Sequence, residues 1–124
     1  MNNFDYVAEN IRQIKADVEE AKAKYRSADE RIDIMAVTKT VPPEIINTAI
    51  QNGINLLGEN RVQEYLSKKD FYDKNADVHF IGHLQTNKIK YIIETVSMIQ
   101  SVDRIELAKE LSRQCLKLQI KKEI

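Results

Sequence analysis

Four short apolar runs recur along this chain at nearly even intervals, and each is followed by a segment with the residue spacing of an amphipathic helix. The runs begin near residues 34, 54, 78 and 98, so the intervals are 20, 24 and 20 residues. Strands that alternate with helices are joined by right-handed crossovers and form a parallel sheet. The sequence therefore predicts an α/β fold built from four βα units within residues 32–124.

The first apolar run, 34–39, ends in a lysine and is followed by two prolines. Its composition predicts a buried strand with Lys39 at the carboxyl end. Pro42 pushes the backbone of Val41 toward extended geometry, and Pro43 suits the first turn of a helix, where its missing N–H would have no partner anyway. We therefore expect a strand, a lysine, a turn and a helix in this order.

A long amphipathic helix is predicted over 4–25, because apolar residues recur there at spacings of three and four. We expect this leading segment, 1–27, to lie against its own domain rather than in a coiled coil. The other elements are predicted in this order: helix 43–52 ending at Gly53, strand 54–57, helix 62–72, strand 78–81, helix 87–96, strand 98–102, helix 104–117 and the opening of another strand at 119–124.

Composition and charge exclude several classes of function. Nineteen basic residues balance nineteen acidic ones with no local excess of either sign, so we expect no nucleic-acid partner and no membrane partner. The hydrophobic content of 43% over 124 residues is ordinary for one globular domain. The single Cys115 cannot form an intrachain disulfide, the polar start does not resemble a signal peptide, and no apolar run reaches membrane-spanning length. We expect a cytoplasmic protein.

Parallel strands bring their carboxyl ends to one edge of the sheet. The residues predicted to gather at that edge are polar: Lys39, Glu59, Asn60, His83 and Asp103. Such an edge is typical of α/β active sites, although loops are polar in general. Asn60 is as well placed to be a helix N-cap as a ligand contact. His79 belongs to a strand pattern and points away from His83, so we predict no shared metal site.

Two architectures satisfy the pattern of alternating strands and helices. A four-stranded open sheet with helices on both faces would be complete at this length, whereas a (β/α)8 TIM barrel needs eight units and about 250 residues. Four units are half of such a barrel. Half a barrel would leave two edge strands and one apolar sheet face unprotected, which favours self-association or the presence of a missing C-terminal half.

Lys39 has three possible roles: a solvated surface charge, an ion-pair partner, or a nucleophilic amine that forms a Schiff base. An amine sheltered from water keeps more of its neutral form, and the neutral form attacks an aldehyde. The sequence contains no glycine-rich dinucleotide fingerprint and no phosphate-loop motif that would favour a different cofactor chemistry.

Four motifs together indicate a protein family. They are Met-Ala-Val-Thr-Lys-Thr at 35–40, Leu-Gly-Glu-Asn-Arg-Val-Gln-Glu at 57–64, His-Phe-Ile-Gly-His-Leu-Gln-Thr-Asn-Lys at 79–88 and Ile-Gln-Ser-Val-Asp at 99–103. In their order and spacing they closely resemble the pyridoxal phosphate homeostasis proteins, a family that looks like the N-terminal barrel domain of alanine racemase standing alone. The resemblance spans essentially the whole chain, but only the N-terminal half of that family's barrel.

The resemblance implies a single domain over 1–124: half of a (β/α)8 TIM barrel, preceded by a long N-terminal helix. It implies that pyridoxal 5′-phosphate is held as a Schiff base on Lys39, with Asn60 beside the cofactor ring and His83 near the mouth of the site. Three further residues would shape the barrel floor: Met35, Ala36 and Thr38.

The resemblance also implies a function in intracellular pyridoxal phosphate homeostasis, as a carrier that keeps a reactive aldehyde from other amines without robust turnover. In that family the residues that grip the phosphate belong to the second half of the barrel, so the site is expected to be incomplete in this truncated chain. Either binding is weak or another polypeptide supplies the missing wall. One alternative is an amino acid racemase, although no second base is evident. The other is a non-catalytic, self-associating half-barrel.

Overall fold

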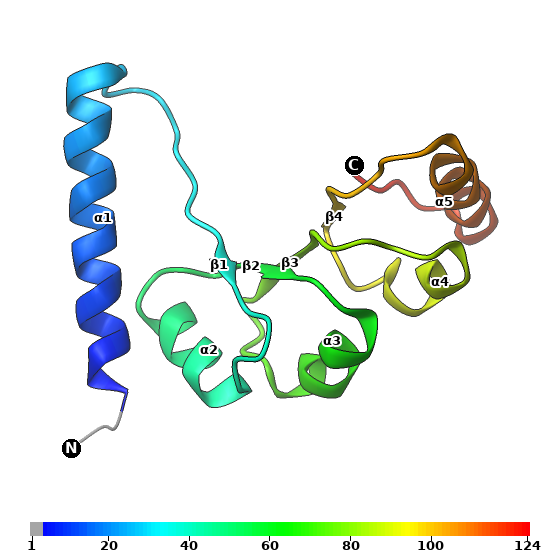
Figure 1. The fold of residues 1–124 in the computed structure, drawn as a ribbon, viewed down its shortest axis with the longest axis horizontal. Helices are drawn as coiled ribbons and strands as arrows, with labels where there is room; N and C mark the ends of the chain where they lie inside the picture. The colour runs from blue at the N-terminus through cyan, green and yellow to red at the C-terminus, as the bar shows by residue number, and fades with distance from the viewer. Residues whose placement is uncertain (1–3) are drawn as a thin grey trace.

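The structure is a computed structural model that describes residues 4–124 (Figure 1). Within these residues, one parallel sheet contains the strands β1 (Ala36–Val37), β2 (Leu56–Glu59), β3 (Asp77–Phe80) and β4 (Met98–Ile99), side by side in chain order. A barrel adds its strands in sequence, whereas a doubly wound sheet reverses its strand order part-way. The predicted α/β fold with a parallel βα repeat is therefore confirmed.

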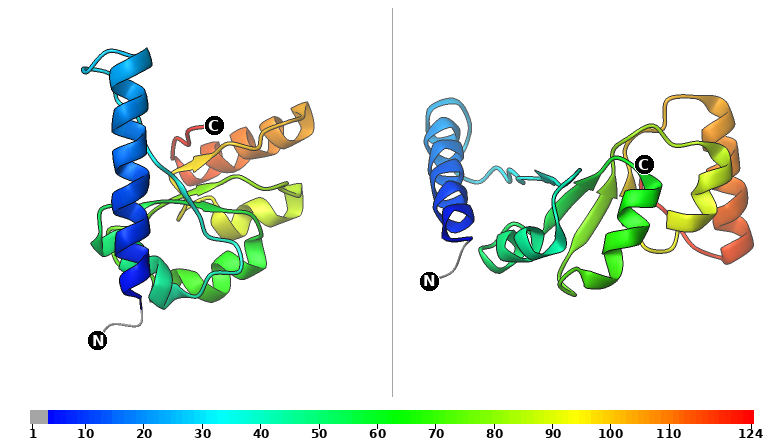
Figure 2. Two further views of the ribbon diagram at one scale, coloured as in Figure 1. Left: turned by 60° about the vertical axis from the view of Figure 1, so that its left-hand side comes forward. Right: turned by 60° about the horizontal axis from the view of Figure 1, so that its bottom comes forward.

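Five α-helices accompany the sheet within the described residues (Figure 2). They are α1 (Asp5–Tyr25), α2 (Pro43–Gln51), α3 (Val62–Lys68), α4 (Ile89–Ile92) and α5 (Ile105–Leu118). Short 3-10 turns, Lys69–Phe71 and Thr86–Lys88, follow α3 and precede α4. As expected, α2 begins at a proline and is followed by Gly53, whose φ of 95° places it in the left-handed region that favours glycine.

One face of the sheet forms the main core. The strand residues that point toward the helices are buried together with one or more side chains from each of α2, α3, α4 and α5. The strand residues are Leu57, Val78, Phe80 and Ile99, and the helix residues include Ile46, Tyr65, Ile92 and Leu107. Because these four helices cover the same face, the open sheet with helices on both faces is excluded. The arrangement is half of a (β/α)8 barrel.

The opposite face, which would line the interior of a full barrel, is open. The strand register pairs Val37 with Gly58, Gly58 with His79 and His79 with Met98, so these four residues form one row across that face. Val37 is 52% exposed, and His79 and Met98 are partly exposed. The prediction of a buried first strand is therefore wrong: β1 is a two-residue edge strand with only its helix-facing side covered.

The leading helix α1 has a packed half and an exposed half. Val7 and Ile11 are buried against Ile54 beside α2, whereas Ile14 is 45% exposed and Tyr25 is 81% exposed. Figure 1 shows the second half of α1 standing clear of the sheet before the chain returns to β1. The predicted packing of this helix against its own domain thus applies to its first half.

Several boundaries differ from the predicted ones. The second strand starts two residues later than expected and includes Glu59, and β4 ends at Ile99 rather than at residue 102. The helices predicted over 62–72 and 87–96 are shorter: 3-10 turns follow α3 and precede α4, and α4 already ends at Ile92. The last segment adds a parallel bridge between Met98 and Glu123, with the Ile99 N–H donating to the Glu123 carbonyl at 3.0 Å, as the predicted strand opening requires. Among residues 4–124, no helix is both long and apolar enough to cross a bilayer.

Candidate functional site

Lys39 lies in a four-residue turn that follows β1. The turn spans 38–41 and is closed by the Val41 N–H, which donates to the Thr38 carbonyl at 3.1 Å. Its third residue, Thr40, has a φ of 62°, a conformation that turns of this kind normally reserve for glycine. A β-branched residue there costs about 1–3 kcal/mol and persists only where the surrounding structure imposes it. Contacts outside the turn must therefore hold it.

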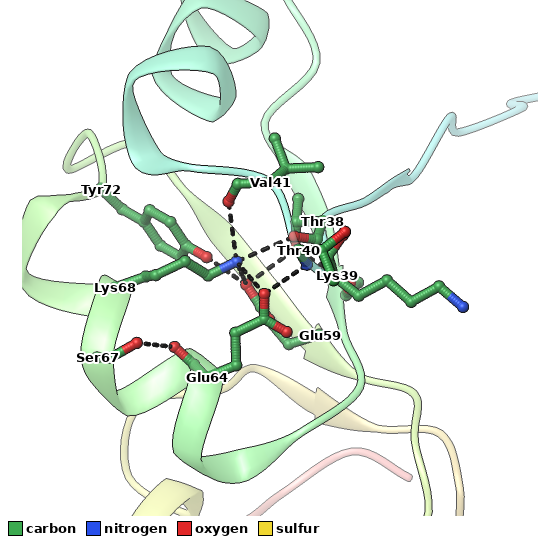
Figure 3. A network of polar contacts seen from close by, with 10 residues as sticks. Thr38, Lys39, Thr40, Val41, Glu59, Glu64, Ser67, Lys68 and Tyr72 are labelled. Atoms are coloured by element: carbon green, nitrogen blue, oxygen red, sulfur yellow. Dashed lines mark hydrogen bonds and ion pairs between the residues drawn. The ribbon is translucent and has the colours of Figure 1, made fainter.

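The Lys39 side chain is exposed and points away from the buried polar groups behind the turn (Figure 3). Within the described part of the chain, its amine makes no hydrogen bond and no ion pair. This differs from the expected amine sheltered by a buried strand, because β1 lies at the edge of an open sheet face. The amine is nevertheless free to react with a ligand at the carboxyl edge of the sheet.

Asn60 follows β2 at the level of Lys39. The register pairs Val37 with Gly58, and the next residues on the same side of each strand are Lys39 and Asn60. The Asn60 Oδ1 atom is buried and has no hydrogen-bond partner among residues 4–124. Asn60 is not the helix N-cap, since that position belongs to Arg61. Its Oδ1 atom is therefore not used by the fold and is a candidate acceptor for a ligand donor.

The loop after β3 approaches Asn60 closely through Gly82. A Cβ atom built on Gly82 would lie 2.1 Å from the Asn60 carbonyl oxygen, so no larger residue fits without a backbone shift. His83 follows directly and is exposed. The ends of β2 and β3 are thus held together, and this contact brings His83 to the same edge of the sheet as Asn60.

A buried polar network lies behind the lysine-bearing turn (Figure 3). Glu59 is fully buried at the end of β2 and accepts hydrogen bonds from the Thr38 hydroxyl at 2.8 Å and from the Tyr72 hydroxyl. The Lys68 amine is 3.5 Å from the Glu59 carboxylate and 3.2 Å from that of Glu64. One ammonium group is therefore shared by two carboxylates in a site that excludes most water.

The environment of this network shifts two titrations. Burial opposes ionisation of Glu64, but the hydrogen bond from the Thr40 amide and the Lys68 ammonium outweigh it and hold the pKa of Glu64 below its ordinary value. Burial, together with the hydrogen bond to the Glu59 carboxylate, raises the pKa of Tyr72 far above its ordinary value. Tyr72 therefore stays protonated and donates to Glu59.

A cavity of about 860 Å³ lies elsewhere, at the amino ends of the strands. Residues of the second half of α1, including Lys15 and Val18, face Leu56, His79 and Met98 across it. It is the space between α1 and the open sheet face, on the opposite rim from the turn of Lys39. We place the chemistry at the carboxyl edge, because the Lys39 amine and the Asn60 Oδ1 atom, which have no partner among the described residues, both lie there. Within residues 4–124, no group of three or more His, Cys, Asp or Glu residues could hold a metal ion.

Comparisons with known proteins now identify the relatives of the chain. No family model matches it. It is 35% identical over 117 residues to the pyridoxal phosphate homeostasis protein of Aquifex aeolicus, a match that covers 94% of this chain and 51% of the relative. It is 36% identical over 109 residues to the protein of the same name from Pseudomonas aeruginosa, covering 87% of this chain and 47% of the relative. The chain is a homologue of the pyridoxal phosphate homeostasis proteins. It spans about half the length of the curated relatives it matches.

Solved structures agree with this relationship and with the half-barrel. A protein from Bifidobacterium adolescentis, described only as an unknown protein, superposes with a TM-score of 0.89 at 26% identity, over 98% of this chain and 55% of the other. PipY from Synechococcus elongatus, determined with pyridoxal phosphate bound, superposes with a TM-score of 0.72 at 29% identity, over 91% of this chain and 50% of PipY. The same protein without the cofactor gives a TM-score of 0.77 at 28% identity, over 94% of this chain and 50% of PipY.

Not all residues implied by the resemblance to pyridoxal phosphate homeostasis proteins come together. Met35 lies on the open sheet face, where its sulfur would be 2.6 Å from a Cβ built on Gly58. Ala36 instead packs against the helix-facing core, and Thr38 is buried beside Glu59. The expected contribution of Ala36 and Thr38 to the barrel floor therefore differs from their placement, because strand residues alternate between the two faces.

Sequence reasoning missed the residues that hold the turn: Glu64, Lys68 and Tyr72. All three come from the segment that begins with α3, far from Lys39 in sequence. The spacing of Glu64 and Lys68 by four residues predicts an ion pair on a helix, and such pairs are usually solvated. No local signal indicates that this lysine is buried.

Proposed function

We propose that the protein binds pyridoxal 5′-phosphate through a Schiff base on Lys39 and acts in pyridoxal phosphate homeostasis rather than in substrate turnover. The observation that carries the proposal is the free, exposed Lys39 amine at the carboxyl edge of a parallel sheet. The names of the homologues and the cofactor bound to PipY support it. In the reaction, the neutral amine and the cofactor aldehyde form a carbon–nitrogen double bond and release one water molecule.

The residues of this edge fit the aldehyde end of the cofactor. Lys39 supplies the amine, and the buried Asn60 Oδ1 atom lacks a hydrogen-bond partner that a ligand would provide. His83 is exposed beside Asn60 and is the third residue we assign to the site. We assign the phosphate to a wall that this half-barrel does not contain. We therefore expect the chain by itself to bind the cofactor weakly.

We further propose that residues 4–124 act as one domain, the N-terminal half of a pyridoxal phosphate-binding barrel, whose open face is completed by another polypeptide segment. The exposed Val37, the exposed second half of α1 and the cavity between α1 and the sheet support this proposal. The segment is either further chain that carries the second half of the barrel or a second copy of this chain. Sedimentation velocity separates these cases: a dimer supports a second copy, and a compact monomer that binds no apolar dye contradicts both.

We propose that the protein is located in the cytoplasm, a reducing compartment. Cys115 is a free thiol that is partly buried on α5, where it packs against the main core. Such a cysteine behaves as a small apolar side chain and needs no oxidising environment.

Labelling followed by reduction tests cofactor binding. The purified protein is mixed with pyridoxal phosphate, reduced with borohydride, digested and mapped by mass spectrometry, with Lys39→Ala as the matched variant. We expect the label to concentrate on the peptide that contains Lys39 and to disappear from it in the variant. No label at Lys39, or an equal yield on many surface lysines, contradicts the proposal.

A further inference from the structure

We propose that Lys68 and Glu64, two residues of α3, act as positioning residues that clamp the turn of Lys39 in its strained conformation and thereby aim the reactive amine at the carboxyl edge of the sheet. This inference rests on the proposed function, because it takes the Lys39 amine to be aimed at the pyridoxal phosphate site. The clamp itself is a property of the described residues and can be tested without cofactor.

The Lys68 ammonium uses all three of its N–H donors inside the protein. It donates to the carbonyl oxygens of Thr38 at 2.9 Å and Val41 at 3.1 Å, the first and last residues of the turn. Its third donor goes to the Glu64 carboxylate at 3.2 Å. The side chain is only 9% exposed, so water offers little alternative to these bonds. A single side chain therefore fixes both ends of the segment that contains Lys39.

The Glu64 carboxylate fixes the middle of the same turn. It accepts a hydrogen bond from the backbone N–H of Thr40, the residue with positive φ. Glu64 and Lys68 are four residues apart on α3, so one helix face presents both groups to the turn. In the observed backbone conformation the Thr40 amide points directly to this carboxylate. The bond therefore favours positive φ where the threonine itself does not.

A second layer of contacts supports the clamp from β2. The buried Glu59 carboxylate lies 3.5 Å from the Lys68 amine and accepts a hydrogen bond from the Thr38 hydroxyl. The Thr38 N–H also donates to the Gly58 carbonyl at 3.1 Å, which continues the β1–β2 ladder up to the turn. The turn is therefore joined to α3 on one side and to the sheet on the other.

The geometry explains why Lys39 faces away from these groups. The buried network takes up both carbonyls at the ends of the turn and the Thr40 amide, and the Lys39 side chain leaves on the other side (Figure 3). If the clamp is removed, Thr40 is expected to relax toward negative φ, and this rotation moves the Lys39 side chain relative to Asn60. Lys68 and Glu64 would thus control reactivity without touching the cofactor.

The test compares Lys68→Met and Glu64→Ala with the control Lys69→Met, whose lysine neighbours Lys68 but pairs only with Asp70 among the described residues. Far-UV circular dichroism first identifies the folded variants. The readout that needs no cofactor is hydrogen exchange of the Thr40 amide. We expect exchange to accelerate by about tenfold in either clamp variant and to stay unchanged in the control. Glu64→Ala removes the acceptor of the Thr40 amide, and Lys68→Met removes the bonds that hold the two ends of the turn.

The second readout is the share of reduced pyridoxal phosphate label on Lys39, measured against exposed surface lysines of the same sample. We expect this share to fall several-fold in Lys68→Met and Glu64→Ala. Thr40→Gly added to Lys68→Met should restore it, since glycine adopts positive φ without strain. Because the share is measured relative to other lysines of the same sample, a general loss of stability would not lower it selectively.

Three outcomes decide the matter. Unchanged exchange of the Thr40 amide in a folded Lys68→Met or Glu64→Ala protein overturns the clamp. If the wild-type protein is labelled at Lys39, a share of label on Lys39 that is as high in the clamp variants as in Lys69→Met also overturns it. If Lys68→Met does not fold, Glu64→Ala carries the same test, because it keeps the bonds from Lys68 to the two carbonyls. A wild-type protein that takes no label at Lys39 overturns the proposed function alone, and the exchange measurement then still decides whether the clamp exists.

Discussion

The two faces of the sheet use neighbouring residues of the same strands in opposite ways. In β3, Phe80 is fully buried under the helices, whereas the adjacent His79 lies on the open face and bonds to Gln100 at 2.8 Å. In β2, Leu57 is fully buried, while Gly58 leaves room for Met35 and Ile81. The helix-facing side is a finished core. The other side is exposed, although residues such as Met35 and Ile81 on it are apolar, as in a protein interior.

This difference separates stability from function. The free energy of folding comes mainly from the helix-facing side, because apolar area is removed from water there. The polar groups without a partner among the described residues that we assign to the ligand, the Lys39 amine and the Asn60 Oδ1 atom, belong to the open side and its carboxyl edge. Substitutions on the two sides should therefore have separable effects.

The largest expected effect is on the helix-facing side. Phe80→Ala should lower the free energy of unfolding by about 3–5 kcal/mol, because it leaves a cavity under the helices. His79→Ala, one residue away on the open face, should cost less than about 1 kcal/mol. Urea unfolding followed by circular dichroism measures both. Equal losses would show that the open face is as well packed as the core.

The leading helix offers a similar contrast within one element. Ile11 is 6% exposed and Ile14 is 45% exposed. Ile11→Ala should destabilise the protein by about 2–4 kcal/mol, since it removes a buried contact with α2. Ile14→Ala should change stability by less than about 0.5 kcal/mol. If Ile14→Ala instead strongly destabilises the protein where sedimentation shows a dimer, but not where it shows a monomer, the exposed half of α1 lies in an interface.

Substitutions at two glycines compare the carboxyl edge of the sheet with its open face. Gly82→Ala should cost about 1–3 kcal/mol, because the new methyl group would collide with the Asn60 backbone. Gly58→Ala should cost less, since its methyl group would meet the side-chain ends of Met35 and Ile81, which can move into the open face. Thermal unfolding ranks the pair. The reverse order would contradict the close backbone approach between the β2 and β3 loops.

The smallest expected effect is a pH dependence from Glu64. Its pKa is lower in the folded protein than its ordinary value of 4.5, so the unfolded chain binds the proton more tightly. The stabilisation is fully present above the unfolded-state pKa and is lost as the pH falls through the folded-state pKa. Urea unfolding between about pH 6 and about pH 3 should therefore show a steeper acid loss for wild type than for Glu64→Gln. If the free energies of unfolding of the two proteins fall in parallel with pH, ionised Glu64 does not stabilise the fold.

The sequence predicted the order and type of the elements because each apolar spacing is a local signal. It predicted the strand ends less well, since the length of a strand depends on the register with its neighbours: β2 runs to Glu59 because it pairs with β3 up to Phe80. Sequence patterns place Lys39, Asn60 and His83 at one edge, but they do not reveal the positive φ of Thr40, which a glycine would have signalled. The burial of Glu59 and Lys68 could not be predicted either, because charged residues inside a core break the apolar pattern.

The most direct test of the account is the mass of the intact protein after incubation with pyridoxal phosphate and reduction with borohydride, measured for wild type and Lys39→Ala in parallel. We predict that a fraction of the wild-type chains gains the mass of one reduced cofactor, and that this fraction falls to the background of the surface lysines in the variant under the same conditions. Equal labelling of the two proteins would show that the amine at the end of β1 has no special reactivity and would contradict the proposed cofactor site.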